Sequence, residues 1–258
     1  MSPRTNRRYN QIGLDRLVRL DWLERTAYLV MAGNDIPNIK SSLQDTISGA
    51  FRSNNTTTRG SIDKTITILM KVWITAPRQL RSFQRDGLKL LSRLPREKHI
   101  AVHWGMIMAV YPFWAAVATQ TGRLLRLQEA AVAKQVQQRV REQYGERETV
   151  SRRVRYVLRS FVDWNVLKET EAKGVYRQGP EILTEDSALI VWLLEATLRS
   201  RSNGSAPIKD LLGSPGIFPF RFDQLSARQI VSLSPRLDIF RHGMDEDLVM
   251  LKENQQTT

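Results

Sequence analysis

The chain has 258 residues and carries 39 lysines and arginines against 26 acidic residues, a net charge of +13 at neutral pH. Hydrophobic residues make up 41% of it, enough for one to three folded domains, and the lack of cysteine excludes disulfides and thiolate metal sites. The surplus of positive charge favours a polyanionic partner over a purely solubilising role. Because no apolar segment of a secretory signal follows the basic N-terminus, we expect a cytoplasmic protein.

We expect the first part of the chain to form a series of helices. Apolar residues recur at helical spacing over 14–32, where "GNDIP" ends the run, and a second helix is expected over 36–50. The polar stretch "RSNNTTTRGS" predicts a loop, after which Ser61 is expected to cap "IDKTITILMKVWI". The β-branched residues of that segment leave a strand open, although its length and cap favour a helix. Next, "PRQLRSFQRDGLKLLSRL" predicts a helix with leucines on one side and basic residues on the others.

An uncharged stretch from Ile100 to Gly122 is within the length that a bilayer span requires. Pro112 in its middle, His103 near one end and "TQT" near the other favour two core helices that meet at Pro112. We therefore expect no membrane span, and a span is the alternative.

The centre of the chain predicts two amphipathic helices followed by a hairpin. Valines at helical spacing mark the first helix in "AAVAKQVQQRVREQYG", which Gly145 ends, and the second lies in "GERETVSRRVRYVLRSFVDWNVL". Two short strands, "VLKE" and "VYRQ", are separated by a turn that contains Gly174.

The last third predicts more helices and a second hairpin. Thr184 is expected to cap the helix "LTEDSALIVWLLEATLRSR", and short helices are expected at "IKDLLG" and "SARQIVSL". The strands "RLDIF" and "DLVMLK" flank "RHGMDE" as a hairpin. The order helix, helix, strand, turn, strand thus occurs twice, at 130–177 and at 207–251.

The second central helix combines an apolar face with a basic one. On a helical wheel, the residues that we expect in the core are Val150, Val154, Val157, Leu158 and Phe161. The opposite side carries Arg152, Arg155 and Arg159, with Tyr156 next to them and Arg153 toward one flank. The rigid guanidinium fork suits phosphate oxygens and guanine edges, so this helix fits both a core and a nucleic-acid surface.

The order of a helix, a turn at "QYGERE", a second helix and a two-stranded hairpin resembles a winged helix-turn-helix over about residues 112–178. In that fold family the second helix enters the major groove and the wing, here "KETEAKGVYR", contacts the flanking backbone. We expect contacts to double-stranded DNA from Arg147, Ser151, Arg152, Arg153, Arg155, Tyr156, Arg159, Lys173 and Arg177.

Further phrases are similar to the layout of the BrxA family of BREX phage-defence systems. They are "AYLVMAGNDIPNIKSSLQDTISGAF", "RQLRSFQRDGLKLLSRL", "HWGMIMAVYPFWAAVA" and "VLRSFVDWNVL". The resemblance implies a small helical DNA-binding accessory protein without a catalytic site. The chain departs from that family by continuing well past Leu167.

These patterns together predict a mainly α fold in three parts. They are an N-terminal helical bundle (1–110), a central winged helix-turn-helix (111–180) and a small C-terminal α+β unit with a β-hairpin (181–258). The last part is expected to be a second winged helix or a dimerisation element, so a homodimer is a further expectation.

Signals of enzymatic activity are few. The chain has no GxxxxGK[ST] phosphate loop, no HExxH and no GxSxG, and we predict a non-enzymatic protein without cofactor or metal. His99 and His103 have a spacing that suits one metal, but the neighbouring Trp104 favours core histidines. Asp163 with "ETEAK" is similar to the carboxylate and lysine pattern of metal-dependent nucleases, which turn residues of a wing explain more simply. Core positions are also expected for Trp73, Trp104, Trp114, Trp164 and Trp192.

The sequence therefore predicts a DNA-binding protein, either an accessory component of a bacterial phage-defence system or a transcriptional regulator. The alternative is an adaptor in a multi-protein complex whose basic face binds an acidic protein partner. Glu169 and Glu171 in the predicted wing favour that alternative, because they oppose close approach of phosphates.

Overall fold

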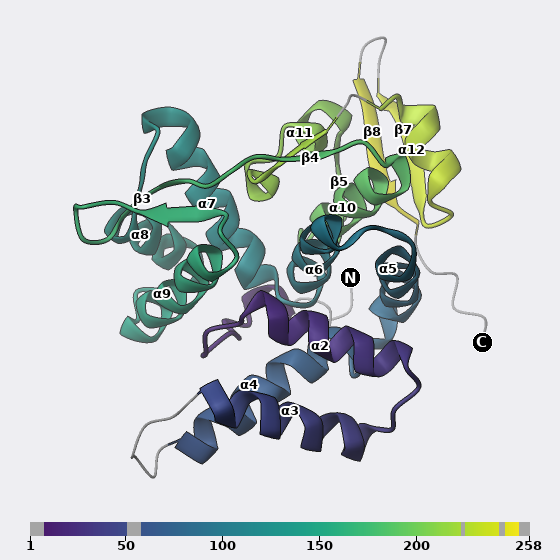
Figure 1. The fold of residues 1–258 in the computed structure, drawn as a ribbon. Helices are drawn as coiled ribbons and strands as arrows, with labels where there is room; N and C mark the ends of the chain where they lie inside the picture. The colour runs from purple at the N-terminus through teal and green to yellow at the C-terminus, as the bar shows by residue number, and fades with distance from the viewer. Residues whose placement is uncertain (1–7, 51–57, 223–224, 243–245, 253–258) are drawn as a thin grey trace.

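The computed structural model describes residues 8–50, 58–222, 225–242 and 246–252 and confirms a mainly helical chain (Figure 1). Most of the predicted loop "RSNNTTTRGS" and residues 243–245 of the predicted turn "RHGMDE" lie outside the described residues. The N-terminal part consists of α2 (Leu20–Met31), α3 (Ile36–Ala50), α4 (Thr58–Trp73), the 3-10 turn η1 (Arg78–Leu80) and α5 (Arg81–Arg93).

Two helix starts differ from the sequence prediction. α2 begins at Leu20 and not at residue 14, because Leu14 has a φ of 54° and Arg19 is extended (φ −82°, ψ 147°), both outside the right-handed helical region. α4 begins at Thr58, so Ser61 lies inside the helix, where its carbonyl accepts a hydrogen bond of 3.0 Å from the Thr65 hydroxyl. The helical interpretation of "IDKTITILMKVWI" is confirmed.

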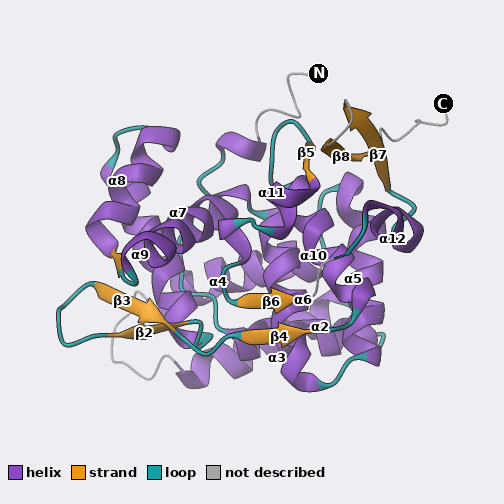
Figure 2. Ribbon diagram, turned by 90° about the horizontal axis from the view of Figure 1, so that it is seen from above, coloured by secondary structure: helices purple, strands orange, loops and turns teal. Residues whose placement is uncertain are grey.

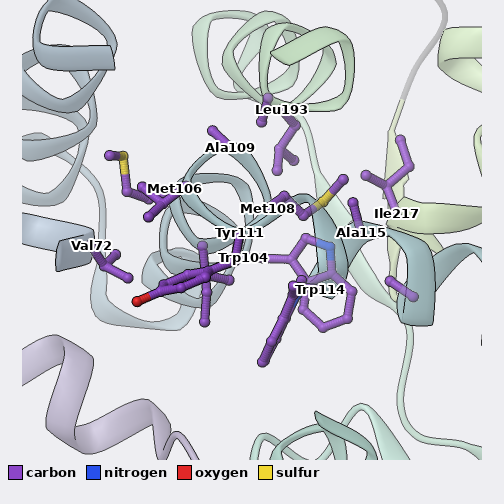
Figure 3. Packing of buried hydrophobic residues seen from close by; sticks show 14 of the residues in the cluster. Val72, Trp104, Met106, Met108, Ala109, Tyr111, Trp114, Ala115, Leu193 and Ile217 are labelled. Atoms are coloured by element: carbon purple, nitrogen blue, oxygen red, sulfur yellow. The ribbon is translucent and has the colours of Figure 1, made fainter. Parts of the chain in front are cut away.

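The apolar stretch forms two helices, α6 (Arg96–Val110) and α7 (Pro112–Gln128), which meet at Pro112 as predicted. Within the described part of the chain, no single helix has the length and apolar character of a membrane span. Only α6 and α7 taken together have both properties, and these two helices are bent by 117° relative to each other. Trp104 and Trp114 are fully buried, with ring centroids 5.5 Å apart at the centre of the core (Figure 3).

The central part runs from α7 through β1 (Ala131–Val132), α8 (Ala133–Tyr144), α9 (Glu148–Asp163), β2 (Leu167–Glu169) and β3 (Val175–Gln178). Gly145 ends α8, as predicted. The hairpin of β2 and β3 is confirmed, and Gly174 in its turn has a φ of 79°, which glycine adopts readily. β1, which the sequence did not predict, pairs with β3, so that the sheet order is β1-β3-β2.

The C-terminal part consists of β4 (Ile182–Thr184), α10 (Ser187–Arg199), β5 (Ser205–Pro207), α11 (Ile208–Leu212), the 3-10 turn η2 (Pro215–Ile217), β6 (Phe220–Phe222), α12 (Ala227–Leu233), β7 (Leu237–His242) and β8 (Glu246–Leu251). The expected cap of α10 was wrong: Asp186 caps it, because Thr184 belongs to β4, which pairs in parallel with β6 (Figure 2). The predicted hairpin is present as β7 and β8, and β5 joins it in the order β5-β8-β7. The series helix, strand, helix, helix and two strands therefore occurs at α7–β3 and again at α10–β8, where η2 and β6 are inserted between α11 and α12, and the two three-stranded sheets have matching strand orders.

One apolar core runs without a break through all three predicted segments. α6 and α10 pack closely because Gly105 has no side chain: a Cβ there would lie 2.3 Å from Cζ3 of Trp192. The Trp192 ring stacks on Phe83 at 4.2 Å, and its Nε1 donates to the Phe83 carbonyl. Buried positions are confirmed for Trp73, Trp104, Trp114, Trp164 and Trp192.

Candidate nucleic-acid interface

α9 buries one face completely and exposes the other. The predicted core residues of this helix are all at most 1% exposed: Val150, Val154, Val157, Leu158 and Phe161. Arg152, Arg155 and Arg159 are exposed on the opposite side, as expected from the helical wheel. Because the valines and Phe161 already hold the helix on the core, the three arginines are available to a ligand.

The exposed arginines have few internal partners. The Arg155 guanidinium lies 3.0 Å from Oε1 of Glu148, but both side chains are more than half exposed, so this pair contributes at most about 1 kcal/mol to stability. Arg152 and Arg159 form no hydrogen bond or ion pair with another described residue. A phosphate oxygen can therefore bind these guanidinium groups without breaking a strong contact.

Two residues expected in the interface are directed elsewhere. Ser151 is only 3% exposed, and its hydroxyl has no hydrogen-bond partner in the described part of the chain, so it cannot reach a ligand on the basic face. The half-buried Arg153 donates a 2.8 Å hydrogen bond to the Gly13 carbonyl. Ser151 and Arg153 therefore lie on flanks of α9 that the fold covers wholly or in part, apart from the exposed row of Arg152, Arg155 and Arg159.

Three further residues expected to contact DNA lie before, on and after α9. Arg147 precedes α9 and is exposed, and its Nη2 donates a 3.1 Å hydrogen bond to the Tyr144 carbonyl. Tyr156 is half-buried, and Lys173 is exposed in the turn of the hairpin. Arg147 and Tyr156 therefore border the three central arginines along α9, and Lys173 belongs to the hairpin that follows it.

The hairpin carries a pair of basic residues, of which the sequence analysis named only Arg177. Lys168 on β2 lies opposite Arg177 on β3, and both side chains are exposed. Side chains alternate along a strand, so Arg177 points away from the sheet face that carries Tyr176, which packs against the core. The structure therefore places Arg177 and Lys168 on the far face of the hairpin from α9. Lys168 was not among the expected contacts, because its position opposite Arg177 depends on the register of the two strands.

A segment distant in sequence braces the end of α9. The Val18 amide donates to the Ser160 hydroxyl at 3.0 Å, and Trp164 Nε1 donates to the Val18 carbonyl at 2.9 Å. Asp163 accepts a 3.3 Å hydrogen bond from the Leu20 amide, and burial raises the pKa of its carboxyl group. These contacts give Asp163 a structural role in holding the start of α2 against α9.

The two histidines at metal-ligand spacing share one buried carboxylate. Glu24 lies 2.7 Å from Nδ1 of His99 and 2.5 Å from Nε2 of His103, while Trp73 Nε1 donates to Nδ1 of His103 at 3.1 Å. His99 Nε2 lies 2.9 Å from the Leu94 carbonyl. No group of three or more potential ligands within the described ranges is arranged to hold a metal. Both histidines are buried, as expected, and Glu24 is the partner that the sequence did not reveal.

A scan against protein-family models and searches of curated proteins and of solved structures found no match to the chain. The arrangement around α9 is therefore interpreted from its own geometry.

Proposed function

We propose that the protein binds double-stranded DNA through a central winged helix-turn-helix, with α9 as the recognition helix. The observation that carries this proposal is the exposed row of Arg152, Arg155 and Arg159 on a helix whose other face is buried. The element order α7, β1, α8, α9, β2, β3 and the sheet order β1-β3-β2 support it. In this interpretation Arg147 and Lys173 contact the flanking phosphates, and the protein has no catalytic role.

The proposal also covers the wider role of the protein. The layout that resembles BrxA favours an accessory component of a bacterial phage-defence system. A transcriptional regulator is the second role that the same DNA-binding activity could serve. Deleting the gene and measuring phage plating efficiency together with transcript levels separates the two. Loss of protection with unchanged transcripts supports the defence role.

The variant that tests DNA binding is Arg152→Gln/Arg155→Gln/Arg159→Gln. Its matched control, Arg78→Gln/Arg81→Gln/Arg85→Gln, removes the same charge from exposed arginines near α5 that pair with no other described residue. We expect the first variant to bind a labelled duplex about 100-fold more weakly in fluorescence anisotropy at low salt. Each phosphate contact contributes about 0.9 to the steepness of log K against log salt concentration. Loss of three contacts should therefore reduce that slope by about 3.

Two outcomes decide the test. Both variants should retain the melting temperature of the parent protein, because the substituted side chains are exposed. Equal loss of binding in the test and control variants would mean that net charge, not α9, determines DNA binding. Unchanged affinity and slope in the α9 variant would place the contact surface elsewhere.

The second candidate function is an adaptor that binds an acidic protein. The observation that favours it is the acidic group beside the basic face: Glu148 is paired with Arg155, and Glu169 and Glu171 are exposed in the hairpin. These carboxylates repel phosphate but are tolerated in a protein interface with mixed charges. Co-purification with a protein partner at high salt, without a mobility shift of DNA, would support the adaptor.

A further inference from the structure

A small pocket lies where the N-terminal segment meets the end of α10 and the C-terminal sheet. Its volume is about 210 Å³, and its polar lining consists of Arg8, Tyr9, Gln79, Arg199, Arg236 and Lys252. Among the described residues, none with a carboxylate lines it. A pocket with four basic side chains and no lining acid is chemically suited to an anion.

Arg8 is the residue that most requires a ligand. One of its donors bonds the Arg199 carbonyl and lies 3.1 Å from the Tyr9 hydroxyl. Its Nε and Nη1 are buried, with no hydrogen-bond partner in the described part of the chain. Burial lowers the pKa of Arg8, and the charge of Arg199 lowers it further. Buried donors without acceptors are costly, so an acceptor in the pocket would stabilise this arrangement.

The other cations are only partly neutralised. Glu195 is fully buried and lies 2.7 Å from both Arg199 and Arg236, and Asp86 lies 2.7 Å from Arg236. These two carboxylates balance Arg199 and Arg236. Arg8 and the exposed Lys252 have no ion pair with a described residue. The pocket therefore retains positive charge after its internal ion pairs are counted.

We propose that this pocket binds a phosphate group, with the guanidinium group of Arg8 and the ammonium group of Lys252 as the two cations that hold it. The volume is below the range of about 300–1,000 Å³ that holds whole small molecules, so it suits a single anionic group. The phosphate is either inorganic or the terminal phosphate of a DNA strand. The site is separate from the basic face of α9, since both views place the C-terminal sheet and α9 far apart (Figures 1 and 2).

The first experiment titrates the full chain with sodium phosphate by calorimetry, against sodium chloride at equal ionic strength. We expect saturable binding of one phosphate per chain and a melting temperature that rises with occupancy. Arg8→Gln should weaken binding at least about tenfold and Lys252→Gln about threefold. Arg228→Gln, on the exposed surface of α12, is the charge-matched control and should bind like the parent protein.

Lys252→Gln keeps the test decisive even if Arg8→Gln unfolds, because Lys252 is exposed. A rise in melting temperature that never saturates and persists in Lys252→Gln would overturn the proposal, since salts excluded from protein surfaces act that way. An unchanged dissociation constant in both variants would overturn it as well.

The second experiment separates the two sources of phosphate. Short single strands with and without a 5′-phosphate are titrated into the Arg152→Gln/Arg155→Gln/Arg159→Gln variant, whose α9 face has lost its charge. Tighter binding of the 5′-phosphorylated strand that requires Lys252 assigns the site to a DNA end. Equal binding of both strands, with inorganic phosphate still dependent on Lys252, assigns it to free phosphate. Binding that is independent of Lys252 for every ligand would refute the site, and none of these results depends on duplex binding by α9.

Discussion

The carboxylate of Glu24 shows how single residues fix the centre of the N-terminal helices. Burial alone would raise its pKa, but hydrogen bonds from His103 and His99 outweigh burial and lower it from 4.5 to about 2. Burial also lowers the pKa of His103, which keeps this ring neutral, with Nδ1 accepting from Trp73 and Nε2 donating to Glu24. Three helices are thereby joined by hydrogen bonds that an apolar core cannot supply.

The depressed pKa of Glu24 makes stability depend on pH. The unfolded chain binds the proton more readily, so the contribution of Glu24 is complete above about pH 4.5 and is lost as the pH falls toward 2. We expect Glu24→Gln to lower the free energy of unfolding at pH 7 by about 3 kcal/mol. The difference from the parent protein should shrink between pH 4.5 and 2 in urea titrations.

The control for this prediction is Glu97→Gln, an exposed α6 side chain without an ion pair to another described residue. It should leave the pH dependence unchanged. If Glu24→Gln has the same pH profile as the parent protein, the carboxylate does not carry the expected charge in the folded state.

At the scale of elements, the contact between α6 and α10 depends on a missing side chain. An alanine Cβ at Gly105 would lie 2.3 Å from Trp192, whose ring is fixed by stacking on Phe83. We expect Gly105→Ala to lower the free energy of unfolding by about 1–3 kcal/mol, measured by thermal and urea unfolding. Gly49→Ala in α3 has the opposite expected sign, a gain of about 0.5–1 kcal/mol, because no described atom lies within 4 Å of its Cβ. Gains in both variants would mean that α10 moves aside without cost.

The same scale shows which elements the sequence can reveal. α8 and α9 follow from valine spacing and from Gly145, which are local signals. β1 has two residues, and it is a strand only because Ala131 and Val132 pair with β3 more than forty residues later. Thr184 was taken for a cap for a similar reason, since its strand partner on β6 is distant in sequence. Elements defined by distant partners leave no periodic pattern to read.

For the molecule as a whole, the candidate site was predictable in its centre and not at its flanks. The apolar ladder of α9 determines that Arg152, Arg155 and Arg159 face outward. The direction of the Arg153 side chain depends on its hydrogen bond to the Gly13 carbonyl, which lies near it only in the folded chain. Arg8 carries no local signal of a site, because its pocket is formed by residues 8–9 and 251–252 together with Arg199 of α10.

A buried charge links the C-terminal hairpin to α10 and α5. Glu195 on α10 is fully buried and accepts from Arg199 and from Arg236, which precedes β7 and also pairs with Asp86 on α5. Removing one partner of a buried ion pair leaves the others without compensation. We expect Glu195→Gln to lower the free energy of unfolding by about 3 kcal/mol.

Hydrogen exchange locates this loss. Amides of β7 and β8 should lose protection before those of α6 and α7, because Arg236 connects the hairpin to both α5 and α10. Glu181→Gln breaks an exposed pair with Arg221 and should cost less than about 1 kcal/mol, without local loss of protection. If Glu195→Gln weakened all helices and strands equally, the β7–β8 hairpin would not open separately from the rest of the molecule. Selective loss in β7 and β8 would instead show that the buried charge holds the hairpin onto a core that is stable without it.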